Sequence, residues 1–158
     1  LRDYNFVPRL TSLINKYNFP TDLIELEITE STFFENINQL LKVISELKHY
    51  GFTFSIDDFG SGYSSLNILK DLPIDVLKLD KGFFPRDNIS KKEKIIVSTI
   101  VDMAKKLDIR VISEGIETIE QCDFLTNIGC DMVQGYLFAK PMPISEFEKI
   151  VSSSNYDF

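Results

Sequence analysis

Cysteines and long apolar runs are scarce in this sequence. Its 158 residues include two cysteines, Cys122 and Cys130, which are too few for a disulfide framework and lack the second pair that a zinc site needs. Both are therefore expected to be small, buried apolar side chains in a protein of the reducing cytoplasm. No apolar run reaches the roughly 18 residues needed to cross a bilayer, which predicts no membrane segment in this chain.

Positive charge is scarce as well. The chain has 17 Lys and Arg residues against 24 Asp and Glu residues, which gives a formal net charge of -7 at pH 7. General nucleic-acid binding needs a basic face that neutralises phosphates, so we do not expect it here. A ligand that contains phosphate would instead need a bridging metal ion or a few well-placed cations.

The overall composition is that of a single globular domain. Apolar residues make up 44% and charged residues 26% of the chain, and residues 1–158 are enough for one domain with a sizeable core. The chain begins at Leu1, without an initiator methionine and without the basic and apolar pattern of a signal peptide. We therefore expect it to be part of a longer parent protein.

The helices are predicted from apolar residues at helical spacing, together with residues that start and stop helices. The predicted ranges are residues 3–18, 36–50, 64–71, 90–107, 118–129 and 145–152. Two of these helices begin with a capping box, formed by Ser90 with Glu93 and by Thr118 with Gln121. In the helix that Ser90 opens, the core-facing stripe is assigned to Ile95, Ile96, Ile100, Met103 and Leu107.

The strands are predicted where short apolar or alternating runs lie between these helices, at residues 23–28, 52–56, 76–80, 109–113 and 132–138. Strands and helices that alternate at this spacing are typical of βαβ units. The sequence therefore predicts an α/β fold, with a parallel sheet and helices outside it. A doubly wound sheet and a (β/α)₈ barrel both fit this description.

Chemically useful side chains stand near the carboxyl ends of the predicted strands, the edge at which both fold types build active sites. They are Glu27, Asp57, Asp58, Lys78, Asp80, Glu114 and Gln134. Each has an ordinary alternative by itself: Asp57 and Asp58 could form an acidic turn, and Glu27 could face water. The combination favours a functional site.

Asp57 and Asp58 are the centre of this hypothesis. Two adjacent carboxylates repel each other unless a cation neutralises them, and hard divalent ions prefer carboxylate oxygens. The pair therefore predicts a magnesium or manganese site. Gly60 and Gly62 follow the pair and interrupt the loop after it.

The sequence resembles the EAL-domain family of cyclic diguanylate (cyclic di-GMP) phosphodiesterases. The matching stretches occur in the family's order and extend over nearly the whole chain. They are Glu27-Ile28-Thr29-Glu30, Asp57-Asp58-Phe59-Gly60-Ser61-Gly62-Tyr63-Ser64-Ser65-Leu66, Leu77-Lys78-Leu79-Asp80, Ser113-Glu114-Gly115-Ile116-Glu117-Thr118 and Gln134-Gly135-Tyr136-Leu137-Phe138-Ala139-Lys140-Pro141. The resemblance implies a modified (β/α)₈ barrel that hydrolyses cyclic di-GMP to linear pGpG in bacterial signalling.

The chain departs from the family pattern because it has neither the Glu-Ala-Leu motif nor the asparagine metal ligand that follows it in the family. The resemblance therefore covers the last part of an incomplete TIM-type barrel, and about five strands would leave two open edges. We expect a truncated product that pairs with another copy, as a homodimer, or a piece of a longer parent. Sensory or GGDEF-type domains are possible upstream, and the parent could be anchored in a membrane with this part in the cytoplasm.

The resemblance also implies roles for individual residues in a two-metal site that uses Mg²⁺ or Mn²⁺. Glu27 and Asp57 correspond to ligands of a first ion, which the absent glutamate and asparagine would complete. Asp57, Asp58 and Glu114 correspond to ligands of a second ion.

The remaining roles concern catalysis and regulation. Lys78 corresponds to the cation beside the nucleophilic water and the scissile phosphate, and Asp80 to the residue that orients it. Gln134 corresponds to a contact with water or substrate, and Glu117 to a neighbouring polar support. A regulatory loop that links the metal site to dimerisation corresponds to Phe59, Gly60, Ser61, Gly62, Tyr63, Ser64 and Ser65, with Glu30 as its anchor.

Three readings of the function remain open. The first is a cyclic di-GMP phosphodiesterase, of which this chain by itself is an inactive or weakly active piece. The second is a catalytically inactive module of the same family that binds cyclic di-GMP or a protein partner. The third is a different barrel enzyme, such as an aldolase or isomerase, in which Lys78 would be the candidate Schiff-base residue.

Overall fold

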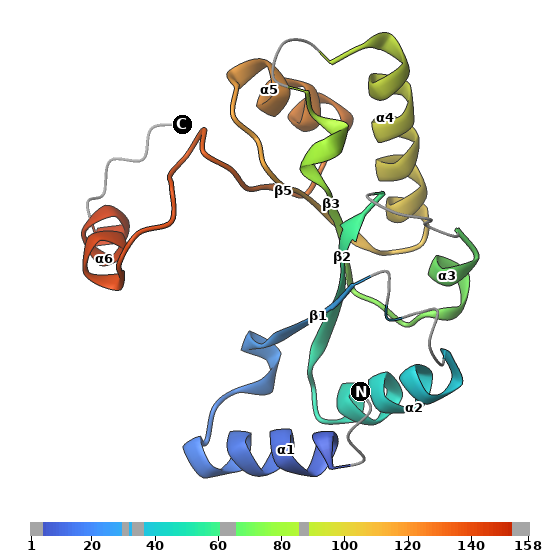
Figure 1. Ribbon diagram of the computed structural model, residues 1–158, viewed down its shortest axis with the longest axis vertical. Coiled ribbons are helices and arrows are strands. Elements are labelled where there is room, and N and C mark those ends of the chain that lie inside the picture. The colour runs from blue at the N-terminus through green and yellow to red at the C-terminus, as the bar shows by residue number, and fades with distance from the viewer. Residues whose placement is uncertain (1–4, 30–31, 33–36, 61–65, 86–88, 153–158) are drawn as a thin grey trace.

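One parallel sheet forms the centre of the protein. The computed structural model describes residues 5–29, 32, 37–60, 66–85 and 89–152. Within these ranges the sheet has five strands in the order β1-β2-β3-β4-β5. Figure 1 shows β1, β2, β3 and β5 running through the middle of the molecule. The strands are β1 (Glu25–Thr29), β2 (Thr53–Phe59), β3 (Val76–Leu79), β4 (Arg110–Ser113) and β5 (Met132–Val133). The predicted α/β architecture of parallel strands alternating with helices is confirmed.

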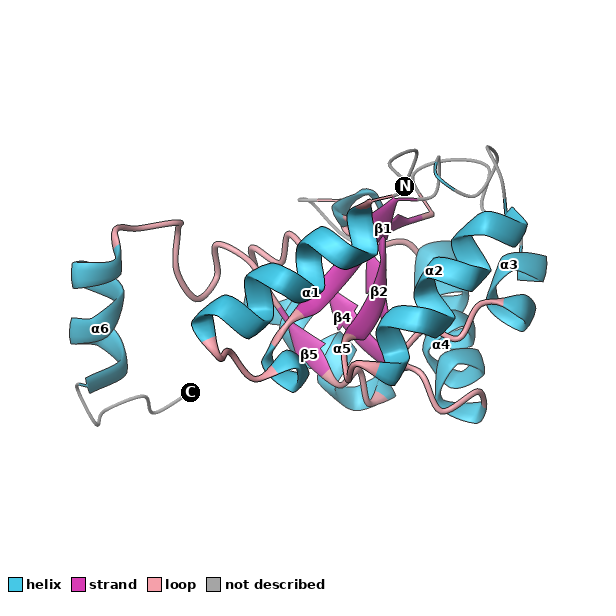
Figure 2. Cartoon of the chain, turned by 90° about the horizontal axis from the view of Figure 1, so that it is seen from below, coloured by secondary structure: helices cyan, strands magenta, loops and turns pink. Residues whose placement is uncertain are grey.

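The helices alternate with the strands along the chain. They are α1 (Phe6–Tyr17), α2 (Ile37–His49), α3 (Leu66–Asp71), α4 (Lys91–Lys106), α5 (Ile119–Ile128) and α6 (Ile144–Ser152). Helices α2 to α5 lie around the strands, whereas α6 stands apart from them in both views (Figures 1 and 2). In the part of the chain that the structure describes, no helix combines the length and the apolar character needed to cross a membrane.

Both predicted capping boxes are present. The Ser90 hydroxyl accepts a hydrogen bond from the Glu93 backbone N–H and opens α4, and the same arrangement of Thr118 and Gln121 opens α5. Helix α5 ends at Gly129, whose φ of 73° is in the left-handed region that favours glycine. Local capping chemistry thus sets these helix boundaries.

The core-facing stripe predicted for α4 is wrong in part. The buried residues of α4 are Val97, Val101 and Ala104, whereas Ile95 is 55% exposed and Ile96 is 49% exposed. The helix carries apolar residues on more than one side, and the smaller side chains at spacings of four and three residues are the ones that face the sheet. Periodicity alone does not choose between these two apolar faces.

Two aspartates tie the strands together near their amino ends. Asp75 precedes β3, and its Oδ2 accepts a hydrogen bond of 2.8 Å from the Phe54 backbone N–H of β2. Asp131 precedes β5, and its Oδ2 accepts one of 2.8 Å from the Val111 N–H of β4. Lys48 of α2 adds an ion pair of 2.8 Å with Asp75. These carboxylates stabilise strand pairing at the end of the sheet opposite to the predicted site.

The two cysteines are free and of intermediate exposure, whereas both were expected to be buried. Cys130 lies beside Ser113, with 3.4 Å between Sγ and the serine Oγ. Burial raises the pKa of the Cys130 thiol, although the hydrogen bond between Cys130 and Ser113 opposes this. The neutral thiol is therefore favoured, which agrees with a structural role.

Gln121 connects two segments of the chain that are far apart in the sequence. Its side chain is 3% exposed. Its Oε1 accepts hydrogen bonds from the backbone N–H groups of Glu117 (2.8 Å) and Thr118 (3.1 Å). Its Nε2 donates to the carbonyls of Phe84 (3.4 Å) and Pro85 (3.3 Å). Gln121 therefore holds the segment after β4 against the segment after β3.

Gln121→Ala is expected to lower the free energy of unfolding by about 2 kcal/mol, because it leaves several backbone groups without their partner. Chemical unfolding followed by circular dichroism measures this change. Asp123→Ala is the matched control, since Asp123 is an exposed residue of the same helix. Equal stabilities of the two variants would show that the buried bridge contributes nothing.

Candidate metal centre

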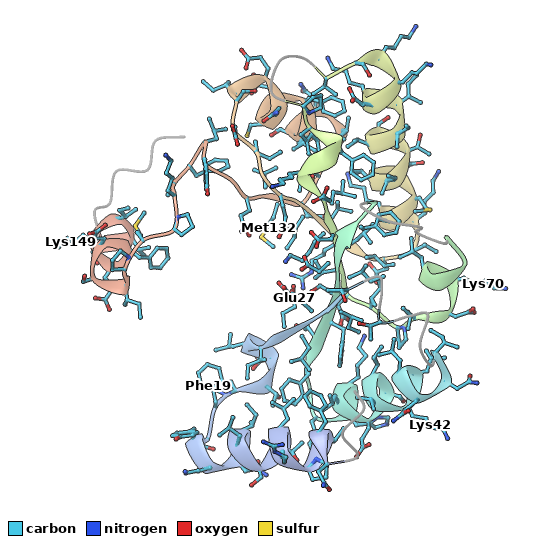
Figure 3. The ribbon with its side chains drawn as sticks, viewed as in Figure 1. Phe19, Glu27, Lys42, Lys70, Met132 and Lys149 are labelled. Carbon is cyan, nitrogen blue, oxygen red and sulfur yellow. The ribbon has the colours of Figure 1, made fainter. Side chains whose placement is uncertain are left out.

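Residues on one face of the sheet build the candidate site. Glu27 of β1 pairs with Ser55 of β2, and Thr29 pairs with Asp57. Because side chains alternate along a strand, Glu27 and Asp57 lie on the same face of the sheet. Phe54 and Ile56, which alternate with Ser55 and Asp57 along β2, are buried on the opposite face. Figure 3 shows Glu27 near the middle of the molecule, where the strands come together, far from Lys149 on α6.

Lys78 of β3 lies at the centre of this face. Its Nζ is 2.6 Å from Glu27 Oε1, 2.9 Å from Asp57 Oδ1 and 2.9 Å from Glu114 Oε1. The Lys78 side chain is only 10% exposed. Burial lowers the pKa of Lys78, but the hydrogen bonds to Glu27, Glu114 and Asp57 outweigh this and raise it above its usual value. The side chain therefore stays positively charged.

A β-bulge brings Asp57 and Asp58 together. The register between β2 and β3 shifts between Ile56 and Phe59, and Asp58 has a left-handed φ of 54°. In a regular strand these neighbours would point to opposite faces, and the extra residue of a bulge changes that. As a result, carboxylate oxygens of Asp57, Asp58 and Glu114 all lie within 4.8 Å of one another.

The chemistry of these oxygens fits a hard divalent cation. Desolvation raises the pKa of Asp58, and so do the negative charges of Asp57 and Asp80, whereas Lys78 lowers it. Negative charge thus exceeds positive charge at the cluster, and carboxylate oxygens are ligands that Mg²⁺, Mn²⁺ and Ca²⁺ accept. Asp57, Asp58 and Glu114 could hold such an ion. Glu27 is a further carboxylate next to the cluster, paired with Lys78.

Asp80, Glu117 and Gln134 are not among the residues whose oxygens converge in this cluster, although the charge of Asp80 acts on Asp58. Asp80 follows β3, and its Oδ1 accepts a hydrogen bond of 2.8 Å from the Gly82 N–H at the start of a 3₁₀ helix, Lys81–Phe83. The Glu117 and Gln134 side chains are exposed. The Gln134 backbone carbonyl accepts a hydrogen bond of 3.0 Å from Ile116 N–H, close to Glu114 in the chain. The roles predicted for these three residues stay predictions.

The predicted regulatory loop is described only at its start. Phe59 ends β2 and is buried, and Gly60 has a φ of 94°, in the left-handed region. A Cβ at Gly60 would overlap the edge of the Phe83 ring, so a larger residue here would need both a strained backbone and a shift of that side chain. Glu30, Ser61, Gly62, Tyr63, Ser64 and Ser65 lie outside the described residues.

Two features of the site were not predicted from the sequence. The first is that Lys78 pairs with three carboxylates at once, which depends on the distance between strands and has no local signal. The second is the β-bulge, for which a signal exists: the buried residues Phe52, Phe54 and Ile56 are two apart, but Phe59 follows Ile56 by three. An odd spacing within one strand indicates an inserted residue.

The fold and this cluster define an α/β domain of the barrel type with a carboxylate-rich site suited to a divalent cation. A model of the EAL domain family matches residues 1–141. The chain therefore belongs to the EAL domain family, and its fold is part of the TIM-type barrel of these domains, as the sequence motifs predicted.

Known proteins similar to this chain include named phosphodiesterases. It is 41% identical to the cyclic di-GMP phosphodiesterase NbdA of Pseudomonas aeruginosa over 134 residues. These residues are 85% of this chain and 17% of NbdA. It is 36% identical to the phosphodiesterase MucR of the same organism in its cyclic di-GMP complex, with a TM-score of 0.83 over 91% of this chain and 58% of the chain in that structure.

A second similar structure was determined in complex with a metal ion. BlrP1 of Klebsiella pneumoniae, in its complex with manganese and cyclic di-GMP, is 32% identical to this chain, with a TM-score of 0.81 over 88% of this chain and 36% of BlrP1. The curated relatives are much longer than this chain, which spans between 15% and 22% of their lengths.

Proposed function

We propose that the parent domain of this chain is a metal-dependent phosphodiesterase that hydrolyses cyclic di-GMP to linear pGpG. The observation that carries this proposal is the convergence of Glu27, Asp57, Asp58 and Glu114 around Lys78 on one face of the sheet. The named activity of NbdA and the cyclic di-GMP complex of MucR support the choice of substrate.

In this proposal the acidic residues hold Mg²⁺ or Mn²⁺. Asp57, Asp58 and Glu114 would ligate one ion, and Glu27 and Asp57 would contribute to a second. When bound, such ions lower the pKa of a coordinated water and neutralise phosphate oxygens. This explains how a chain with a net charge of -7 could act on an anionic nucleotide.

The residues of the chain then have the following roles. Lys78 presents its ammonium to the scissile phosphate, and Asp80 helps to orient that ammonium. Gln134 contacts water or substrate, and Glu117 supports it. The net reaction adds one water across one phosphodiester bond and opens the cyclic dinucleotide.

The 158 residues by themselves are expected to hydrolyse cyclic di-GMP weakly or not at all. The sequence contains no Glu-Ala-Leu tripeptide, so the chain does not supply the glutamate and asparagine that the family resemblance assigns to the first ion. A site with half of its ligands binds a metal ion more weakly and holds it less precisely.

The experiment that tests this function is hydrolysis of cyclic di-GMP with Mn²⁺, followed by chromatography of the linear product. It compares this chain with a longer chain that includes the preceding part of the barrel. Turnover in the longer chain supports the proposal. Tight binding of cyclic di-GMP without turnover would instead support an inactive binding module, and trapping of a carbonyl compound on Lys78 by borohydride would support an aldolase-type enzyme.

A further inference from the structure

We propose that Lys78 is a built-in placeholder for the divalent cation. In the metal-free protein its ammonium holds the carboxylates of Glu27, Asp57 and Glu114 together, and it releases Asp57 and Glu114 when a divalent ion binds. This inference rests on the proposed function, because it concerns the same site. It goes beyond that function by giving Lys78 a role before any substrate is present.

The first argument is the position of the side chain. Lys78 is on β3, and its carboxylate partners come from β1, from β2 and from the segment directly after β4. Its ammonium therefore connects three separate segments of the sheet edge with contacts between 2.6 and 2.9 Å. Without a cation at this point the three carboxylates would repel one another.

The second argument is that the lysine and the candidate metal site share ligands. Asp57 and Glu114 are two of the three residues whose oxygens converge within 4.8 Å, and both are already paired with Lys78. Two cations that draw on the same oxygens repel each other at short range. Lys78 therefore keeps the ligands in position but competes with the ion for them.

The third argument is the balance of charge. One ammonium cannot neutralise Glu27, Asp57 and Glu114, and Asp58 stands beside them. The excess negative charge still favours a divalent ion over the lysine at the shared oxygens. Glu27 is outside the cluster of Asp57, Asp58 and Glu114, so it remains a partner for the displaced ammonium as long as that cluster holds the one bound ion. Other lysine pairs differ: Lys48 with Asp75 and Lys106 with Asp102 each involve a single carboxylate, away from the cluster.

Lys78→Met in the full chain tests the proposal, because methionine keeps much of the length of the side chain and removes its charge. Mn²⁺ affinity is measured by calorimetry, and thermal unfolding is followed with EDTA and with Mn²⁺. We expect the midpoint in EDTA to fall, while the Mn²⁺ dissociation constant decreases roughly tenfold because a competing positive charge is gone. Lys48→Met is the matched control: it also loses an ion pair, but its Mn²⁺ affinity should equal that of the wild type.

A second measurement uses the unmodified protein and does not depend on the folding of a variant. The ¹⁵N resonance of the Lys78 ammonium, assigned by its loss in Lys78→Arg, should shift when Mg²⁺ binds, since two of its three partners are taken. If the wild type binds Mn²⁺ and Lys78→Met binds it no more tightly, the placeholder alone is overturned. The same holds if the Lys78 resonance does not move when the protein binds Mg²⁺. Failure of the wild type to bind either ion overturns the metal site of the proposed function and the placeholder with it.

Discussion

Asp57→Asn is expected to lower cyclic di-GMP hydrolysis by the catalytically complete parent by roughly a thousandfold, the scale on which removal of a preorganised electrostatic group acts. Asp57 belongs both to the carboxylates that pair with Lys78 and to the cluster of candidate metal ligands. Its carboxylate pairs with Lys78 at 2.9 Å and also belongs to the oxygen cluster with Asp58 and Glu114. Asparagine has the same shape but carries no charge and offers one oxygen in place of two.

The measurement is kcat/KM for formation of the linear dinucleotide at saturating Mn²⁺, together with Mn²⁺ affinity. Lys78 keeps Glu27 and Glu114 in this variant, so the fold should be retained and circular dichroism should match the wild type. Asp102→Asn is a suitable control, because it removes a carboxylate from an exposed i,i+4 pair on α4. Turnover close to that of the wild type in Asp57→Asn would refute the role of Asp57 as a metal ligand in the proposed function.

Much of the fold could be predicted because local signals determine it. The capping boxes at Ser90 and Thr118 predict the starts of two helices, and the short apolar runs predict where the strands lie along the chain. Tertiary contacts decided the rest. The predicted strand at residues 132–138 ends at Val133, because the chain then turns to exchange backbone hydrogen bonds with Ile116. No pattern within that heptapeptide distinguishes such a turn from a strand.

The candidate site was predictable as a set of residues but not as an arrangement. Parallel strands present their carboxyl ends at one edge of the sheet, and this rule predicts that Glu27, Asp57 and Glu114 lie close together. Their relation to Lys78 depends on which face each strand presents and on the bulge at Asp58, and a shift of one residue would reverse it. For this reason the sequence predicts the candidate acidic ligands, whereas only the structure shows that a lysine pairs with three of these carboxylates.

Gly135→Ala is expected to destabilise the protein by about 3 kcal/mol, which is at the upper end of the usual cost of overpacking. A Cβ at this position would lie 2.0 Å from the carbonyl oxygen and 2.3 Å from the backbone nitrogen of Ile116. Both atoms belong to a backbone that is fixed on two sides: Ile116 N–H donates to the Gln134 carbonyl at 3.0 Å, and the Ile116 carbonyl accepts from Leu137 N–H at 3.0 Å. Because Ile116 is also fully buried, neither segment can move away without breaking these contacts.

Thermal unfolding measures this effect, with an expected fall of the midpoint by roughly 6 to 12 °C for a domain of this size. Gly82→Ala is the matched control, since its Cβ would meet only the Asp80 side chain, at 2.7 Å, and a side chain can rotate away. The Gly135 variant should also weaken Mn²⁺ binding, because the same backbone contacts hold the segment that carries Glu114. If Gly135→Ala unfolds at the same temperature as Gly82→Ala, the close approach of the two backbone segments does not stabilise this end of the sheet.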